Sequence, residues 1–166
     1  WSDTAPVLAT GATHLWLCDT DAQRDSALLA DYLALLDADE SERLQRLVFE
    51  RDRHRFLVSH ALLRSVLSLY GGQPAGSWRF LKGRHGKPEL VPVQRERAPA
   101  FNLSHSGSLA LLAVSAGAGL LGVDIEVLAA VAADDADADA LLRCDVERAT
   151  KQRRAQRTGC EEHARS

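Results

Sequence analysis

All nine aromatic residues of this 166-residue chain lie at or before Phe101, and the remainder of the chain contains none. Aromatic side chains bury the largest areas in protein cores, so the core must be built from the earlier part of the sequence. Residues 132–140 form an Ala/Asp repeat, and no apolar periodicity continues beyond Leu142. We therefore expect residues 129–166 to form an atypical tail that is poorly ordered or partly helical.

The composition is that of a folded chain of about one ordinary domain, with 46% hydrophobic and 26% charged residues. No apolar run approaches the roughly 18 residues that a membrane span requires. The three cysteines, Cys18, Cys144 and Cys160, are odd in number and far apart, which argues against a disulfide framework and a zinc site. They suit a reducing compartment, so the sequence predicts a cytoplasmic protein with no membrane partner.

Charge is distributed unevenly along the chain. Residues 1–42 carry nine acids and one base, whereas residues 43–97 carry twelve bases and four acids. A basic middle in a chain of net charge −3 indicates a localised anionic ligand, although a solvated helix face would give the same pattern. Nucleic acid is an unfavoured partner, because the acids balance the bases and no recognition motif is present.

The first half of the basic region has a helical pattern. An acidic N-cap at Asp37 with Glu40 three residues later predicts a helix that begins there. A second helix is predicted from about Asp52 to Tyr70, and Gly71-Gly72 ends it. One face of this helix should carry the residues that recur at spacings of three and four, namely Phe56, His60, Leu63, Leu67 and Tyr70.

Short extended segments surround these helices. Strands are predicted over residues 14–18, 78–81, 90–93, 101–104, 109–114 and 120–127, with turns at 83–86 and 105–108 and a loop at 95–99. Helices come first and a mostly antiparallel meander follows. This order predicts the α+β fold class.

Two carboxylates stand at alternate positions of the last predicted strand. Asp124 and Glu126 share one face, while Val123 and Ile125 point to the other. Like charges this close repel each other unless a cation lies between them, and Mg²⁺ prefers such oxygen ligands. A solvent-facing acidic pair at a strand end remains the alternative.

Polar residues that suit phosphate binding follow the preceding strand. Ser104 and His105 lie where a strand meets a turn, and Lys87 lies on a Gly-Lys-Pro turn. Ordinary hairpin-turn chemistry would explain the same residues. Arg55 and Arg64, nine residues apart on one helix, could also reach a phosphate, and one of them is expected to serve only as a helix-surface or salt-bridge residue.

In combination, these motifs resemble a known enzyme family. The motifs are Asp52-Arg53-His54-Arg55, Leu62-Leu63-Arg64, Gly86-Lys87-Pro88, Phe101-Asn102-Leu103-Ser104-His105-Ser106 and Gly122-Val123-Asp124-Ile125-Glu126. In this order and spacing, over roughly residues 13–128, the sequence resembles the 4′-phosphopantetheinyl transferases of the larger, pseudo-dimeric type, which activate carrier proteins of peptide and polyketide synthases in secondary metabolism.

The resemblance implies an activity and a set of site residues. Enzymes of this family transfer 4′-phosphopantetheine from coenzyme A to a serine of an acyl or peptidyl carrier protein. By resemblance, Asp124 and Glu126 hold Mg²⁺, and Arg55, Lys87, Ser104 and His105 hold the phosphates of coenzyme A. His105 is also carried over as the catalytic residue. The full-length form of the family is expected to be monomeric.

One departure from the family pattern bears on activity. The family's last motif, an aromatic residue followed by a Lys-Glu pair and a further lysine, has no counterpart here, because the chain contains no Lys-Glu dipeptide. We therefore expect a truncated or fragmentary member: residues 1–117 form the N-terminal half, residues 118–128 form the first strand of a second half with the metal motif, and residues 129–166 form the tail. A non-catalytic module that binds coenzyme A or a carrier protein is the alternative.

Overall fold

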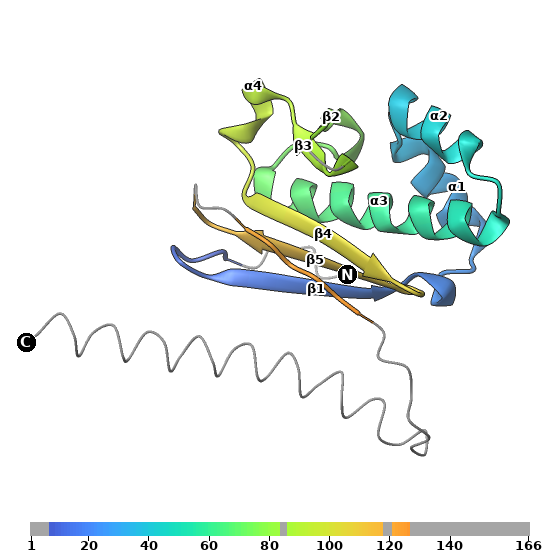
Figure 1. Ribbon diagram of the computed structural model, residues 1–166. Helices are drawn as coiled ribbons and strands as arrows, with labels where there is room; N and C mark the ends of the chain where they lie inside the picture. The colour runs from blue at the N-terminus through green and yellow to red at the C-terminus, as the bar shows by residue number, and fades with distance from the viewer. Residues whose placement is uncertain (1–6, 84–85, 118–120, 127–166) are drawn as a thin grey trace, which may run out of the picture. The chain divides into compact units, whose positions relative to one another are not determined.

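The computed structural model describes residues 7–83, 86–117 and 121–126. The tail predicted for residues 129–166 lies outside this part of the chain. The elements, shown in Figure 1, are β1 (Thr13–Asp19), η1 (Thr20–Ala22), α1 (Ser26–Leu35), α2 (Ala38–Arg46), α3 (Glu50–Gly71), η2 (Ala75–Ser77), β2 (Phe80–Lys82), β3 (Pro88–Leu90), α4 (Pro92–Arg95), β4 (Ala100–Ser106) and β5 (Leu109–Ser115).

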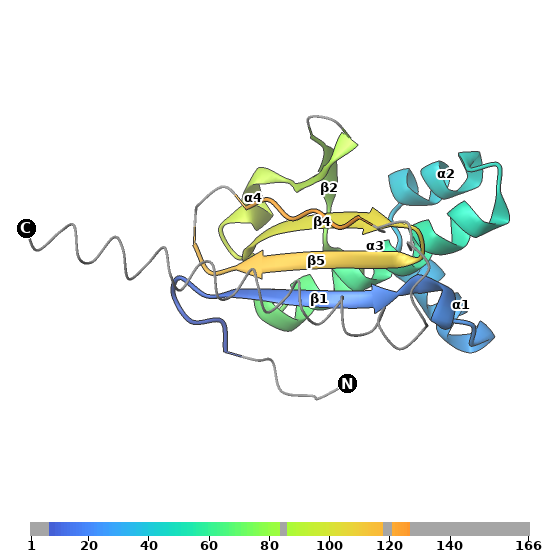
Figure 2. The ribbon, with the colours of Figure 1, turned by 60° about the horizontal axis from the view of Figure 1, so that its bottom comes forward.

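The strands form two antiparallel sheets rather than one meander. The larger sheet has the order β1-β5-β4, so the first strand pairs with the last, from Thr13 opposite Ser115 to Asp19 opposite Leu109. Strands β2 and β3 form a separate two-stranded sheet. Helix α3 lies across one face of the larger sheet (Figures 1 and 2). The α+β class predicted from the sequence is confirmed.

Helix α2 begins as its sequence predicts. The Asp37 side chain accepts a hydrogen bond from the backbone N–H of Glu40 at 3.0 Å, and the Glu40 side chain accepts one from the backbone N–H of Asp37 at 3.1 Å. This reciprocal capping box satisfies two backbone donors that would otherwise lack partners at the helix start. It also draws the Glu40 carboxylate to the inner side of the helix, where its residue is only 6% exposed.

Helix α3 is the centre of the fold. It ends at Gly72, which adopts the left-handed conformation (φ 64°) and donates its N–H to the Ser68 carbonyl at 3.0 Å. Nearly all its residues from Leu57 to Leu67 are buried. The sequence spacing predicted that only one face of the helix would be buried, whereas the structure buries the helix on all sides over this stretch. The reason is that α3 contacts β5 on one side and helices α1, α2 and η2 on others. Helix α1 was not predicted, because apolar residues occur all round it.

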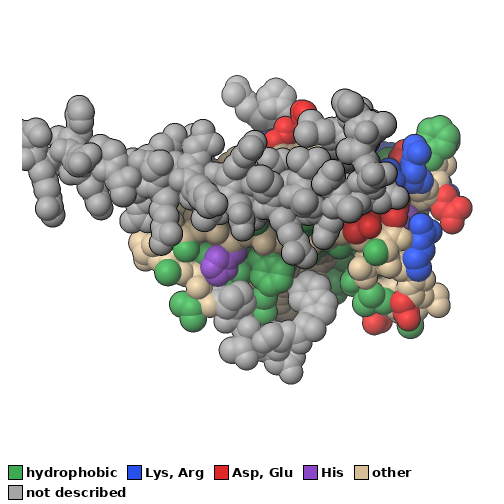
Figure 3. Space-filling view, turned by 90° about the horizontal axis from the view of Figure 1, so that it is seen from below, with side chains coloured by type: hydrophobic (Ala, Val, Ile, Leu, Met, Phe, Trp, Pro, Cys, Tyr) green, Lys and Arg blue, Asp and Glu red, His purple; other side chains and the backbone are tan. Residues whose placement is uncertain are grey.

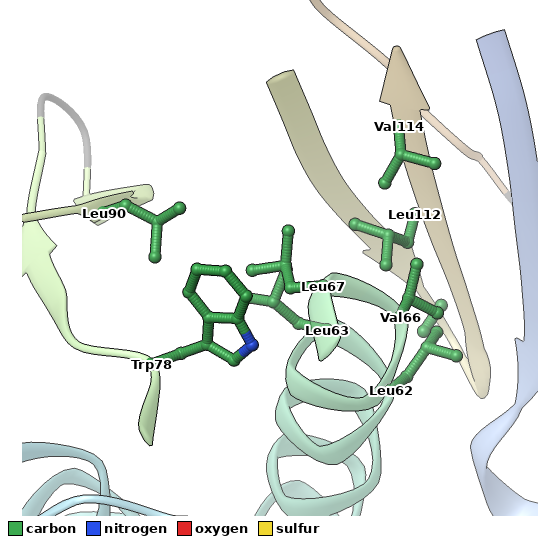
Figure 4. Close-up of a cluster of buried hydrophobic side chains, with 9 residues drawn as sticks. Leu62, Leu63, Val66, Leu67, Trp78, Leu90, Leu112 and Val114 are labelled. Atoms are coloured by element: carbon green, nitrogen blue, oxygen red, sulfur yellow. The ribbon is translucent and has the colours of Figure 1, made fainter. Parts of the chain in front are cut away.

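Trp78 fills the space between α3 and the small sheet. Its indole is fully buried beside Leu63, Leu67 and Leu90, whereas Leu112 and Val114 of β5 cover the other side of α3 (Figure 4). A fully buried tryptophan contributes one of the largest areas to a core. The strand predicted over residues 78–81 therefore begins later, at Phe80, since Trp78 packs in the core before the sheet starts.

Replacing Gly71 by alanine should lower the free energy of unfolding by about 1–3 kcal/mol, because a Cβ at this position would lie 2.7 Å from the Trp78 ring and overpack the core. Chemical denaturation followed by tryptophan fluorescence measures the change. Gly76→Ala is the matched control, since a Cβ there meets nothing within 4 Å. Equal stabilities of the two variants would contradict the packing described for Trp78.

Two further sequence predictions need correction. Residues 121–126 run beside β4 but belong to neither sheet, so the strand predicted over 120–127 is wrong for these residues (Figure 2). Residues 90–93 were predicted as extended and 95–99 as a loop, yet α4 occupies Pro92–Arg95. Proline at the first helical position favours this short helix, since its fixed φ suits a helix start.

The outer face of the larger sheet, seen from below in Figure 3, carries exposed hydrophobic side chains. Leu15 and Leu17 of β1 point to this face and are 41% and 48% exposed. They alternate with Trp16 and Cys18, which pack against the core, so β1 carries apolar residues on both faces. No helix in the described part of the chain is long and apolar enough to cross a membrane.

Candidate functional site

A cavity of about 610 Å³ lies where α2, α3, the turn after β2 and the β4–β5 hairpin meet. We call it the basic pocket, because five arginine, lysine and histidine side chains line it and Asp52 is its one acidic residue. These bases are Arg43, Arg55, His60, Lys87 and His105. Each comes from a different part of the sequence or a different turn of α3, so the fold is what brings them together. A pocket with this charge suits an anionic ligand.

Arg55 lies on the first part of α3 and is held by an acid from η1. Its Nη2 donates to Oδ2 of Asp21 at 2.8 Å and its Nε donates to Oδ1 at 3.2 Å. This bidentate pair lowers the pKa of the Asp21 carboxyl, with the Arg55 hydrogen bonds as the largest cause. Asp21 therefore orients Arg55 at the pocket rim and offsets part of its charge.

Lys87, from the turn before β3, and His105, from β4, also line the pocket. Lys87 follows Gly86, which has φ 76°, in a turn closed by a 2.8 Å hydrogen bond from the Gly83 N–H to the Lys87 carbonyl. Both side chains are exposed, so a ligand can reach them. Of the four residues that the resemblance assigns to the phosphates of coenzyme A, Arg55, Lys87 and His105 line this pocket.

Ser104 lies on the other face of β4 and does not join these three residues. Successive side chains of a strand point to opposite faces, so Ser104 and His105 diverge. The Ser104 hydroxyl donates a 2.7 Å hydrogen bond to Oδ1 of Asp124, and the Asn102 side chain accepts one from the Val123 N–H at 3.3 Å. Ser104 thus positions the acidic segment instead of facing the basic pocket.

The acidic pair has the alternation predicted from the sequence. Asp124 and Glu126 are exposed, whereas Val123 and Ile125 are half-buried. The hydrogen bond from Ser104, then that from the Ile125 N–H, lower the pKa of the Asp124 carboxyl, so it is ionised at neutral pH.

Carboxylate oxygens are ligands that Mg²⁺ prefers, and waters and substrate phosphates commonly complete its shell. Within residues 7–83, 86–117 and 121–126, no group of three or more His, Cys, Asp or Glu residues forms a complete metal site. Asp124 and Glu126 could therefore supply part of a magnesium shell, with the remaining ligands coming from elsewhere.

Arg64, the second arginine considered for phosphate binding, is fully buried and has a structural role. Its guanidinium donates to Asp37 at 2.9 Å, to Glu40 at 2.8 Å and to the carbonyls of Ala75 and Trp78 at 3.1 and 3.0 Å. The group therefore ties the start of α2 to α3 and to the segment before β2. It has no access to a ligand.

Three pocket residues were missed by the sequence analysis as functional candidates. The rings of Phe56 and His60 stack at 3.9 Å, and the Arg43 guanidinium lies 5.4 Å from the Phe56 ring centre. Phe56 and His60 were noted only for their helical spacing. That spacing of four could have indicated an aromatic pair on one helix face.

Most of the residues that line the basic pocket lie in a segment that matches a known protein family. The family described as 4′-phosphopantetheinyl transferase, N-terminal, matches residues 23–117, which include the residues of α3, the Lys87 turn and the β4–β5 hairpin. The chain therefore belongs to the 4′-phosphopantetheinyl transferase family.

Curated relatives carry the same family name. A putative 4′-phosphopantetheinyl transferase of Synechocystis sp., slr0495, is 37% identical over 115 residues, which are 69% of this chain and 44% of the relative. The 4′-phosphopantetheinyl transferase HetI of Nostoc sp. is 37% identical over 122 residues, 74% of this chain and 50% of the relative. The 4′-phosphopantetheinyl transferase Sfp of Bacillus subtilis is 28% identical over 95 residues, which are 57% of this chain and 40% of the relative. The chain thus spans half or less of the length of these relatives.

Proposed function

We propose that this chain supplies the coenzyme A-binding half of a magnesium-dependent 4′-phosphopantetheinyl transferase that acts on an acyl or peptidyl carrier protein. The observation that carries the proposal is the basic pocket, in which Arg55, Lys87 and His105 meet within the segment that matches the family. Coenzyme A is a polyphosphate, so a pocket with three or more cationic groups suits it.

The reaction needs charge neutralisation and alignment more than it needs a protein nucleophile. The carrier-protein serine oxygen forms a bond to phosphorus, and the bond from that phosphorus to the bridging pyrophosphate oxygen breaks. Adenosine 3′,5′-bisphosphate leaves with the electron pair, and the serine gives its proton to solvent water. Arg55 and Lys87 hold phosphate oxygens. His105, the proposed catalytic residue, donates a hydrogen bond as negative charge develops on the leaving group.

Asp124 and Glu126 are the proposed magnesium ligands, and the bound ion would neutralise pyrophosphate charge. Ser104 acts through Asp124 rather than on coenzyme A directly, which revises the role expected from the sequence. In this proposal residues 1–117 form the N-terminal half and residues 118–128 begin the second half with the metal motif. The protein would act in the cytoplasm as a monomer in its full-length form.

An assay on an apo carrier protein tests the proposal. The carrier protein is incubated with this chain, coenzyme A and Mg²⁺, and mass spectrometry detects the gain of a phosphopantetheine group. Calorimetry measures coenzyme A binding in parallel. Transfer supports the enzymatic proposal. Binding without transfer supports the alternative, a non-catalytic module that binds coenzyme A. If the chain shows no coenzyme A binding and no transfer, both the enzymatic proposal and the alternative are contradicted.

Replacing Lys87 by glutamine should weaken coenzyme A binding about tenfold, because one charge-assisted phosphate contact is lost. Isothermal titration at fixed Mg²⁺ measures the change. Lys82→Gln is the matched control, since Lys82 is an exposed lysine at the end of β2 that does not line the basic pocket. Equal affinities of the two variants would count against the pocket as the coenzyme A site.

A further inference from the structure

His60 is a pocket-lining histidine with a fixed orientation. It is 8% exposed, its Nδ1 lies 2.7 Å from Oε1 of Glu40, and its ring stacks on Phe56. One ring edge is therefore anchored to α2 and one ring face is covered. A histidine anchored in this way presents its remaining nitrogen, Nε2, in a defined direction.

The charges behind His60 form a buried cluster. Arg64 carries one positive charge, and Asp37 and Glu40 each carry one negative charge within hydrogen-bonding distance of it. Burial acts to raise the pKa of the Glu40 carboxyl, but the hydrogen bonds from His60 and Arg64 outweigh this, so the pKa is lowered and the carboxylate stays ionised. An imidazolium at His60 would bring the cluster to neutrality.

The two protonation states of His60 differ in what they offer a ligand. Because the Glu40 carboxylate accepts from Nδ1, a neutral ring has its lone pair on Nε2 and cannot donate there. A protonated ring donates from both nitrogens. In the described part of the chain Nε2 makes no hydrogen bond, so the nitrogen is available to a ligand in the basic pocket.

We propose that His60, supported by Glu40, is a proton-controlled anion-binding residue of the basic pocket. When protonated it donates Nε2–H to a phosphate group, and when neutral it presents a lone pair that repels the same group. This inference rests on the proposed phosphate-binding function of the pocket. The other charged or titratable groups around His60 are Arg43 from α2, Asp52 and Arg55 from α3, Lys87 from the turn and His105 from β4.

Inorganic pyrophosphate is the probe that tests the proposal. Its affinity for the wild-type chain, measured by calorimetry at pH 6 and at pH 8.5, should be higher at pH 6, because the protonated form of a histidine is more abundant at the lower pH. Pyrophosphate itself gains negative charge as pH rises, which acts in the opposite direction. His60→Gln should bind about tenfold more weakly than wild type at pH 6 and equally at pH 8.5. His14→Gln, which removes a histidine paired with Tyr70 outside the pocket, should match wild type at both pH values.

A second measurement covers the case in which His60→Gln does not fold. In the wild-type chain, saturating pyrophosphate should move the pH midpoint of the His60 ring resonances in NMR to a higher value. An unmoved midpoint, equal affinities of wild type and His60→Gln at pH 6, or no pyrophosphate binding at all would each overturn the proposal. A His60-dependent pyrophosphate affinity without coenzyme A binding or transfer would overturn the proposed function alone.

Discussion

Replacing Arg64 by leucine should lower the free energy of unfolding by about 3–5 kcal/mol at pH 7, because it leaves buried carboxylates without their cation. Glu40 and Asp37 have side chains that are 8% and 13% exposed, and both are paired with the fully buried Arg64 guanidinium. The carbonyls of Ala75 and Trp78 would lose their donor as well. Urea denaturation followed by circular dichroism measures the change.

The pH dependence of this loss has a defined sign. In the wild-type chain the pKa of Glu40 is lowered, so its contribution to stability is present above the unfolded pKa, near 4.5, and is lost as pH falls through the folded value. Without Arg64, its hydrogen bond and charge no longer lower this pKa, so the folded pKa of Glu40 is higher in the variant than in wild type. The difference in unfolding free energy between wild type and Arg64→Leu should therefore shrink as pH falls from 7 toward 4.

Arg46→Leu is the matched control for the Arg64 experiment. Arg46 forms an ion pair with Glu42 on the surface of α2, with side chains that are 73% and 61% exposed. Exposed pairs of this kind contribute about 0–1 kcal/mol. A loss of stability for Arg64→Leu that is as small as the loss for Arg46→Leu, or that does not change with pH, would show that the buried cluster does not hold α2 to α3.

Replacing Asp124 by alanine should abolish the magnesium-dependent part of phosphopantetheine transfer, a fall of more than about 100-fold, because a metal ligand worth several kcal/mol of charge stabilisation is removed. Where the chain binds coenzyme A without transfer, the enhancement of that binding by Mg²⁺ should disappear instead. The mass-shift assay and calorimetry at several Mg²⁺ concentrations measure these two quantities.

Two further variants sharpen the Asp124 experiment. Ser104→Ala removes the hydroxyl that positions Asp124, and should weaken the response to Mg²⁺ about tenfold while leaving the carboxylate in place. Asp31→Ala removes an exposed carboxylate from α1 and should have no effect. Transfer by Asp124→Ala at the wild-type rate would remove Asp124 from the metal site.

Local signals in the sequence predicted the main elements well. The Asp37–Glu40 capping pattern, the glycine pair after Tyr70 and the alternation around Asn102 each depend on neighbouring residues, and each predicted an element that the structure contains. The pairing of β1 with β5 has no local signal, because it joins the first and the last strand of the described chain, which lie far apart in the sequence. The burial of α3 all round also depends on which elements pack against it.

The sequence indicated which residues belong to the candidate site better than it indicated how their side chains are placed relative to one another. Asp124 and Glu126 alternate as expected, and Arg55, Lys87 and His105 line one pocket. The sequence analysis grouped Ser104 with His105, whereas strand geometry places them on opposite faces of β4. The partners of His60 were not predictable, since the capping box draws Glu40 inward only when α2 packs on α3.

The pairing of β1 with β5 sets the order in which this fold can be assembled. Thr13 cannot pair with Ser115 until almost all of the described chain has been synthesised. Strand β1 therefore remains unpaired with β5 while the helices form. Contacts between residues so far apart in sequence slow folding, because a long loop must close before they form. During that interval the edge of β1 that will pair with β5 is open, and an unpaired strand edge is prone to pair with another chain. Closure of the larger sheet is thus the late step at which a nascent chain is most exposed to misassembly.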